Sequence, residues 1–110
     1  MIVCVVVNES GAVGGGWGKA RRVALADVVD GAITAWQEVD VRWDEAHDQG
    51  TEGSHHARIV EFLRENGVEV AVAGHMGPPM QNTLAKLGVR VVLGTSGDAR
   101  AAAVAAAQAT

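Results

Sequence analysis

The sequence is poor in cysteine, has no excess of positive charge and contains no long hydrophobic run. Its one cysteine, Cys4, excludes a disulfide framework and any metal site built from several thiolates of one chain. The 110 residues hold 9 Lys and Arg against 13 Asp and Glu, so nucleic-acid binding through bulk positive charge is excluded. The apolar run of residues 2–7 is too short for a signal peptide or a membrane span. We therefore expect a soluble, cytoplasmic protein.

The overall composition is typical of a folded globular chain. Hydrophobic residues make up 48% of the sequence and the net charge is −4, which together argue against disorder. A chain of 110 residues can bury one core but not two. We expect residues 1–110 to form a single domain.

Apolar patterning predicts five strands. Three largely apolar runs are typical of strands buried on both faces of a sheet, and they are Ile2–Val7, Val68–Ala73, which only Glu69 interrupts, and Val89–Leu93. Arg22–Val29 and Thr34–Trp43 predict two more strands, joined across the turn signal Asp30-Gly31. The first three strands in the chain are therefore expected to pair in sequence order.

Helical spacing and stop signals predict three helices. They are Ser54–Asn66 with Gly67 as its stop, a helix whose first turn holds Pro78 and which ends at Gly88, and Asp98–Ala109 with Asp98 as its cap. The predicted order is β-β-β-α-β-α-β-α, an α/β fold with a five-stranded mixed sheet. Ligands in such folds bind at the carboxyl edge of the strands, where the helices begin.

Histidines gather at this expected edge. His55, His56 and His75 fall on it, and His47 lies on the approach to it. Imidazole binds transition metals at neutral pH, so converging histidines could hold one. The alternative is that His56 packs under its helix while His55 and His75 are solvated.

A glycine-rich segment precedes a short basic stretch. Five glycines between residues 8 and 18 predict a loop that faces a ligand, with Trp17 as its apolar anchor. It is not a phosphate-binding loop, because Ala20 stands where a hydroxyl is needed and a strand follows. Lys19, Arg21 and Arg22 favour an anionic ligand, although three basic residues at a strand start are also common on a solvated face.

Catalytic signals are weak. Cys4 lies inside the first apolar run and is expected to be an inert core thiol. No serine stands in a nucleophile-elbow context, and the strand of residues 2–7 has no carboxylate to hold magnesium for nucleic-acid hydrolysis. The sequence therefore favours a binding protein over an enzyme.

Several motifs together carry a family resemblance from Ile2 to about Leu93. They are the opening strand, Trp17-Gly18-Lys19-Ala20, the helix start of residues 53–63, and Gly74-His75-Met76-Gly77-Pro78 after a strand. In these features the chain resembles the dinitrogenase iron–molybdenum cofactor biosynthesis family, which includes the NifX and NafY cofactor carriers and the C-terminal domain of many NifB proteins.

The resemblance implies a ribonuclease-H-like α/β fold and a binding protein, not a catalyst. Its implied cargo is the iron–molybdenum cofactor of nitrogen fixation or an iron–sulfur precursor cluster, carried between metallocofactor assembly proteins. The metal ligands it implies are His75 with one of His55 and His56. Contacts to the cluster are expected from Gly15, Gly16, Trp17, Lys19, Gly74 and Gly77.

A different class of function stays open on the sequence alone. In it the histidines are incidental, and the same sheet edge binds a protein or an anionic small molecule without metal. Under either interpretation we expect no nucleic-acid or membrane partner, and a monomer or a homodimer.

Overall fold

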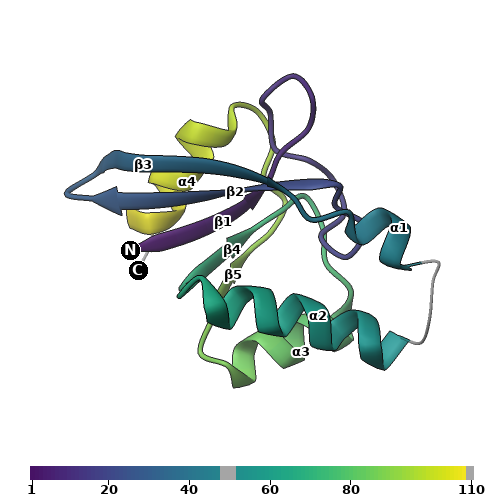
Figure 1. The fold of residues 1–110 in the computed structure, drawn as a ribbon. Coiled ribbons are helices and arrows are strands. Elements are labelled where there is room, and N and C mark those ends of the chain that lie inside the picture. The colour runs from purple at the N-terminus through teal and green to yellow at the C-terminus, as the bar shows by residue number, and fades with distance from the viewer. Residues whose placement is uncertain (48–51, 109–110) are drawn as a thin grey trace.

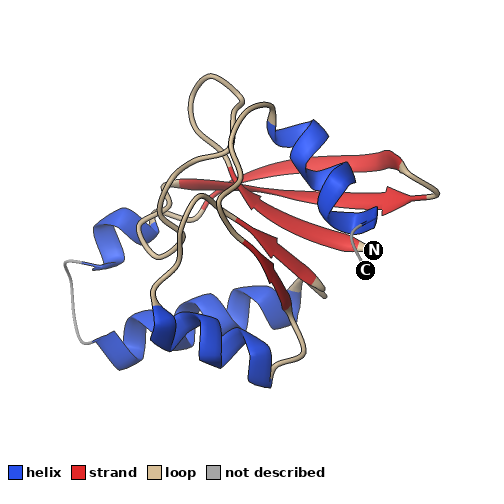
Figure 2. Ribbon diagram, turned by 180° about the vertical axis from the view of Figure 1, so that it is seen from behind, coloured by secondary structure: helices blue, strands red, loops and turns tan. Residues whose placement is uncertain are grey.

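The computed structural model describes residues 1–47 and 52–108, which form a mixed sheet with helices on both faces (Figures 1 and 2). The strands are β1 (Ile2–Val6), β2 (Arg22–Val29), β3 (Ala32–Asp40), β4 (Val70–Val72) and β5 (Arg90–Val92). The helices are α1 (Trp43–His47), α2 (Glu52–Glu65), α3 (Pro78–Lys86) and α4 (Ala99–Gln108). The predicted α/β class and five-stranded mixed sheet are confirmed.

The sheet has the order β3-β2-β1-β4-β5. β2 runs antiparallel to both of its neighbours, whereas β1, β4 and β5 are parallel to one another. The turn between β2 and β3 uses Asp30 at φ 52° and Gly31 at φ 77°, the positive angles that a tight hairpin requires. Because β1, β3 and β4 run the same way, their carboxyl ends meet at one edge.

Two apolar layers hold this edge in place. On one face of the sheet, side chains of β1 and β2 pack against α2 and α3, with Ile59, Leu63 and Leu84 buried at its centre. On the other face, alternate residues of β1 and β2 pack against the alanine side of α4. Small alanine side chains let this helix lie close to the sheet, and Asp98 accepts a hydrogen bond from the Ala101 amide at 2.9 Å, as its predicted capping role requires.

The expected order of elements is wrong in one place. The sequence pattern predicts a strand over Thr34–Trp43, but β3 ends at Asp40 and Trp43 begins the additional helix α1. Arg42 turns the chain with a φ of 53°, and the Trp43 amide then donates to the carbonyl of Ala20 at 2.8 Å. Trp43 is thereby buried at the helix start instead of continuing the alternation of the strand.

Cys4 is fully buried in β1, and this burial raises the pKa of its thiol. The predicted core thiol is confirmed. No helix among the described residues is long and apolar enough to cross a membrane.

Candidate functional site

The glycine segment of residues 14–17 fits between the ends of β1 and β4. The Gly14 amide donates to the Val6 carbonyl at 2.8 Å, and the His75 amide donates to the Gly15 carbonyl at 2.8 Å. The Trp17 amide in turn donates to the His75 carbonyl at 3.0 Å. These bonds extend the sheet past its strand ends and fix His75 beside the glycine segment.

Gly74 makes this close approach possible. A Cβ on Gly74 would lie 2.9 Å from the Gly15 carbonyl oxygen and 3.1 Å from the Gly15 Cα, both of which are backbone atoms that cannot rotate away. Gly74 therefore allows the two backbone segments to lie in contact, and it does not line the hollow described next.

We expect Gly74→Ala to destabilise the fold by about 1–3 kcal/mol, because the added methyl group must push the glycine segment away from β4. Gly77→Ala is the matched control on the other side of His75, since a Cβ there meets only the Pro79 Cδ at 3.9 Å. Urea unfolding followed by circular dichroism compares the two. Equal midpoints for both variants would contradict the steric role of Gly74.

Next to the glycine segment lies a hollow of about 540 Å³, here called the first hollow. Six residues predicted for the site line it, namely Gly16, Lys19, His55, His56, His75 and Gly77. They come from the segment before β2, from α2, and from the turn between β4 and α3. The structure therefore brings together predicted residues that lie up to 61 positions apart in the sequence, from Gly16 to Gly77.

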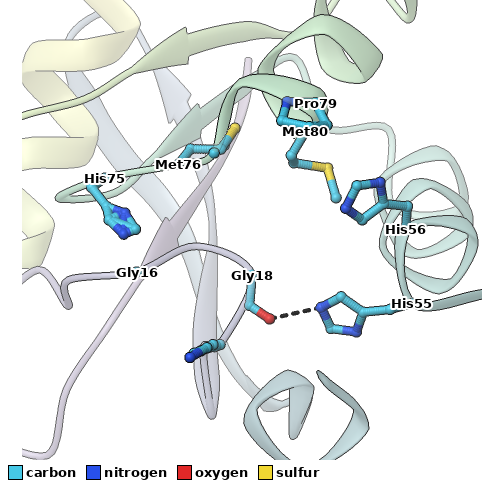
Figure 3. A pocket seen from close by; sticks show the side chains of 10 residues that line it. Gly16, Gly18, His55, His56, His75, Met76, Pro79 and Met80 are labelled. Atoms are coloured by element: carbon cyan, nitrogen blue, oxygen red, sulfur yellow. Dashed lines mark hydrogen bonds between the residues drawn. The ribbon is translucent and has the colours of Figure 1, made fainter. Parts of the chain in front are cut away.

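The histidines enter the first hollow from different sides (Figure 3). His75 lies beside Gly16, while His56 projects from α2 next to the thioether of Met80. His75 is exposed and His56 is half-buried. In the part of the chain that the structure describes, no three His, Cys, Asp or Glu side chains are grouped closely enough to hold a metal ion.

His55 makes a different contact from the other two. Its Nε2 lies 2.7 Å from the Gly18 carbonyl oxygen, so this nitrogen carries the proton and donates it (Figure 3). The ring is only 5% exposed and its Nδ1 is buried. His55 therefore ties α2 to the residues that follow the glycine segment.

The alternative interpretation, in which His56 is packed and His55 is solvated, is wrong for both residues. Among the side chains of α2 that the structure describes, His55, Ile59 and Leu63 are buried, whereas His56 is half-buried and reaches the hollow. Residues four positions apart lie on the same face of a helix, so His55 lies on the face of the buried Ile59. This spacing is the sequence signal that identifies the inward face of α2.

Three predicted cofactor contacts lie outside the first hollow. Trp17 is fully buried in the core, with its ring centroid 5.2 Å from that of Trp43. Gly74 shapes the backbone as described above, and Gly15 lines a neighbouring hollow instead. Trp17 therefore contributes to the fold around the hollow, through its packing in the core and the backbone hydrogen bond to His75.

Sequence reasoning missed four residues that line the first hollow. They are Gly18, Met76, Pro79 and Met80. The two methionines place soft thioethers in the wall, and both are nearly buried. Pro78 and Pro79 open α3, and because proline has no amide proton, the start of this helix offers fewer donors to an anion than an ordinary helix start. The signal was present in the sequence, since His75, Met76 and Met80 occur within six residues of one another.

The fold is that of a small α/β protein with a hollow at the carboxyl edge of its sheet. The family model for dinitrogenase iron-molybdenum cofactor matches residues 1–110, and the chain belongs to this family. A comparison with curated proteins finds no match.

Two solved structures share the fold. The crystal structure of PH0822 has 17% sequence identity and a TM-score of 0.74, over 96% of this chain and 88% of that one. The apo form of the orange protein from Desulfovibrio gigas has 20% identity and a TM-score of 0.71, over 94% of this chain and 83% of the other. At these identities the likeness concerns the fold.

Proposed function

We propose that this protein binds an anionic metal–sulfur cluster in the first hollow and passes it between metallocofactor assembly proteins. The observation that carries the proposal is that His56 and His75 line one hollow of about 540 Å³ from opposite sides. Membership of the dinitrogenase iron-molybdenum cofactor family supports the same cargo, either that cofactor or an iron–sulfur precursor.

The arrangement favours a cluster over a single ion. Three ligands for one ion are not grouped among the described residues, but two imidazoles on opposite walls suit a cargo wide enough to meet both. The thioethers of Met76 and Met80 give the wall a soft, polarisable surface, which is compatible with sulfide.

Among the described residues that line the first hollow, Lys19 carries a positive charge. Lys19 is exposed and forms no ion pair with any residue the structure describes, so its ammonium group is available to an anionic cargo. Such a site holds its cargo with few protein ligands. Release to an acceptor therefore requires few bonds to break, which suits a carrier more than an enzyme that retains its cluster.

His55 is proposed to hold this site open without itself binding metal. Its bond to the Gly18 carbonyl fixes the start of α2 against the segment that carries Lys19. Its remaining ring nitrogen is buried, so metal binding by His55 would require the ring to give up its bond to Gly18 or to turn until Nδ1 is exposed.

The test is an anaerobic titration of the purified apo-protein with iron–molybdenum cofactor and, separately, with a simple iron–sulfur cluster. Visible absorption follows binding, and metals are counted after desalting. We expect one of the two clusters to be retained stoichiometrically. Retention of neither would refute the proposal and favour an interaction module without metal at this sheet edge.

The two lysines of the chain provide a matched pair of variants for the same titration. Lys19→Gln is expected to weaken cluster binding about fivefold, and more at low ionic strength, because it removes one partly screened charge contact. Lys86→Gln removes the same charge from the last turn of α3, outside the first hollow, and should leave binding unchanged. Equal effects of both variants would mean that only net charge matters.

A further inference from the structure

A second hollow of about 470 Å³ lies on the other side of the glycine segment. Its walls are residues 6–9, residues 14–16, residues 19–22 and His75. It shares only Gly16, Lys19 and His75 with the first hollow. The two hollows therefore meet along one narrow boundary.

The two hollows differ in chemistry. The first offers imidazoles and thioethers, which are ligands for soft and borderline metals. The second offers the side chains of Lys19, Arg21 and Arg22 against the one carboxylate of Glu9. Guanidinium and ammonium groups recognise carboxylate and phosphate oxygens.

The cations of the second hollow are not equally available. Arg22 donates from Nε to Asp40 at 2.7 Å and also lies near Glu38, and the hydrogen bond to Asp40 is the main reason that its pKa is raised. Arg21 has one looser contact, 3.7 Å to Asp44, and its side chain is 63% exposed. Arg21 and Lys19 are therefore the groups that can turn toward a ligand.

Backbone donors add to these charges. Among the hydrogen bonds of the described residues, the Gly15 and Gly16 amides donate to no protein acceptor, although both glycines line the second hollow. Unused amide donors beside cationic side chains are the usual means by which proteins bind oxyanions.

We infer that the second hollow is an oxyanion subsite that takes a carboxylate or phosphate group. The subsite adjoins the first hollow but does not depend on the function proposed for it. Lys19 and His75 line both hollows.

The experiment uses the whole apo-protein with malonate and with inorganic phosphate as probes, and needs no cluster. Backbone ¹H–¹⁵N spectra at low ionic strength are expected to show saturable shifts centred on the Gly15 and Gly16 amides. Saturable shifts with either anion support the subsite, and the anion that binds more tightly identifies the ligand class. Shifts that do not saturate, or that spread evenly over all basic surface residues, would overturn it.

Charge variants sharpen the test. Arg21→Gln should weaken the tighter anion about fivefold, and Glu9→Gln should strengthen it about twofold, because the two changes alter the local charge in opposite directions. Arg64→Gln, on α2 away from the second hollow, is the control and should have no effect. Equal weakening by Arg21→Gln and Arg64→Gln would contradict the subsite.

The two proposals fail separately. If the protein retains no cluster but the glycine amides still respond to anions, the proposed cargo is wrong and the oxyanion subsite stands. If a cluster is retained with equal affinity by the wild type and by Arg21→Gln, and neither anion shifts the glycine amides, the subsite is wrong and the cluster proposal stands.

Discussion

Replacing Trp17 by alanine should cost about 3–5 kcal/mol of the free energy of unfolding, the range for removing a buried tryptophan from a core. Trp17 is fully buried and packs at a tilt of 54° on Trp43, whose ring meets Phe62 edge to face. Since the free energy of unfolding of small domains is about 5–15 kcal/mol, this loss would be a large fraction of the stability of the protein. Urea unfolding followed by far-ultraviolet circular dichroism measures it.

Trp17→Phe is the matched variant. The indole Nε1 is buried and has no hydrogen-bond acceptor among the described residues, so phenylalanine removes an unsatisfied donor while it keeps most of the packing. We expect a much smaller loss of stability than for alanine. A loss below 1 kcal/mol for Trp17→Ala, or equal losses for both variants, would show that the aromatic cluster does not hold the glycine segment in place.

Removing the imidazole of His75 is expected to weaken cluster binding at least tenfold, which corresponds to about 1.4 kcal/mol. His75 is exposed at the first hollow, and its backbone is held by Gly15 and Trp17. The side chain can therefore be removed without loss of those bonds. Cluster affinity of His75→Ala under anaerobic conditions measures the effect, with the unfolding midpoint as the check on folding.

His56→Ala should weaken binding in the same way, and the double variant should retain no cluster after desalting. The two side chains approach from different walls, so neither can replace the other. Wild-type affinity in the double variant would show that neither His56 nor His75 binds the cluster.

Local patterns predicted the sheet because each strand has a strong local signal. Ile2–Val6 is an uninterrupted apolar run, and Asp30-Gly31 specifies a hairpin turn whatever the rest of the chain does. Helix α1 was missed because its formation depends on a distant contact. Trp43 continues the alternation of β3 in sequence, and only its packing on Trp17 and its bond to Ala20 turn it into a helix start.

The sequence predicted which residues lie near one another at the hollow better than it predicted how each side chain is placed. His75, Lys19 and Gly16 were placed at the correct edge because the carboxyl ends of β1 and β4 must meet there. The apolar spacing of α2 does distinguish His55 from His56, since adjacent helical residues differ by about 100° in direction and His55 lies four residues before the buried Ile59. That Met80 of α3 lines the same hollow as His56 of α2 could not be predicted, because it depends on how both helices pack on the sheet.

The most direct test of the central claim is pulsed electron paramagnetic resonance of the protein loaded with a paramagnetic cluster, prepared once at natural abundance and once with ¹⁵N-labelled histidine. If imidazole nitrogen binds the cluster, ¹⁴N modulation appears in the first sample, is replaced by ¹⁵N couplings in the second, and is lost in the variant lacking both His56 and His75. Identical spectra from the two samples would show that no histidine binds the cluster, and the account of the first hollow would then be wrong.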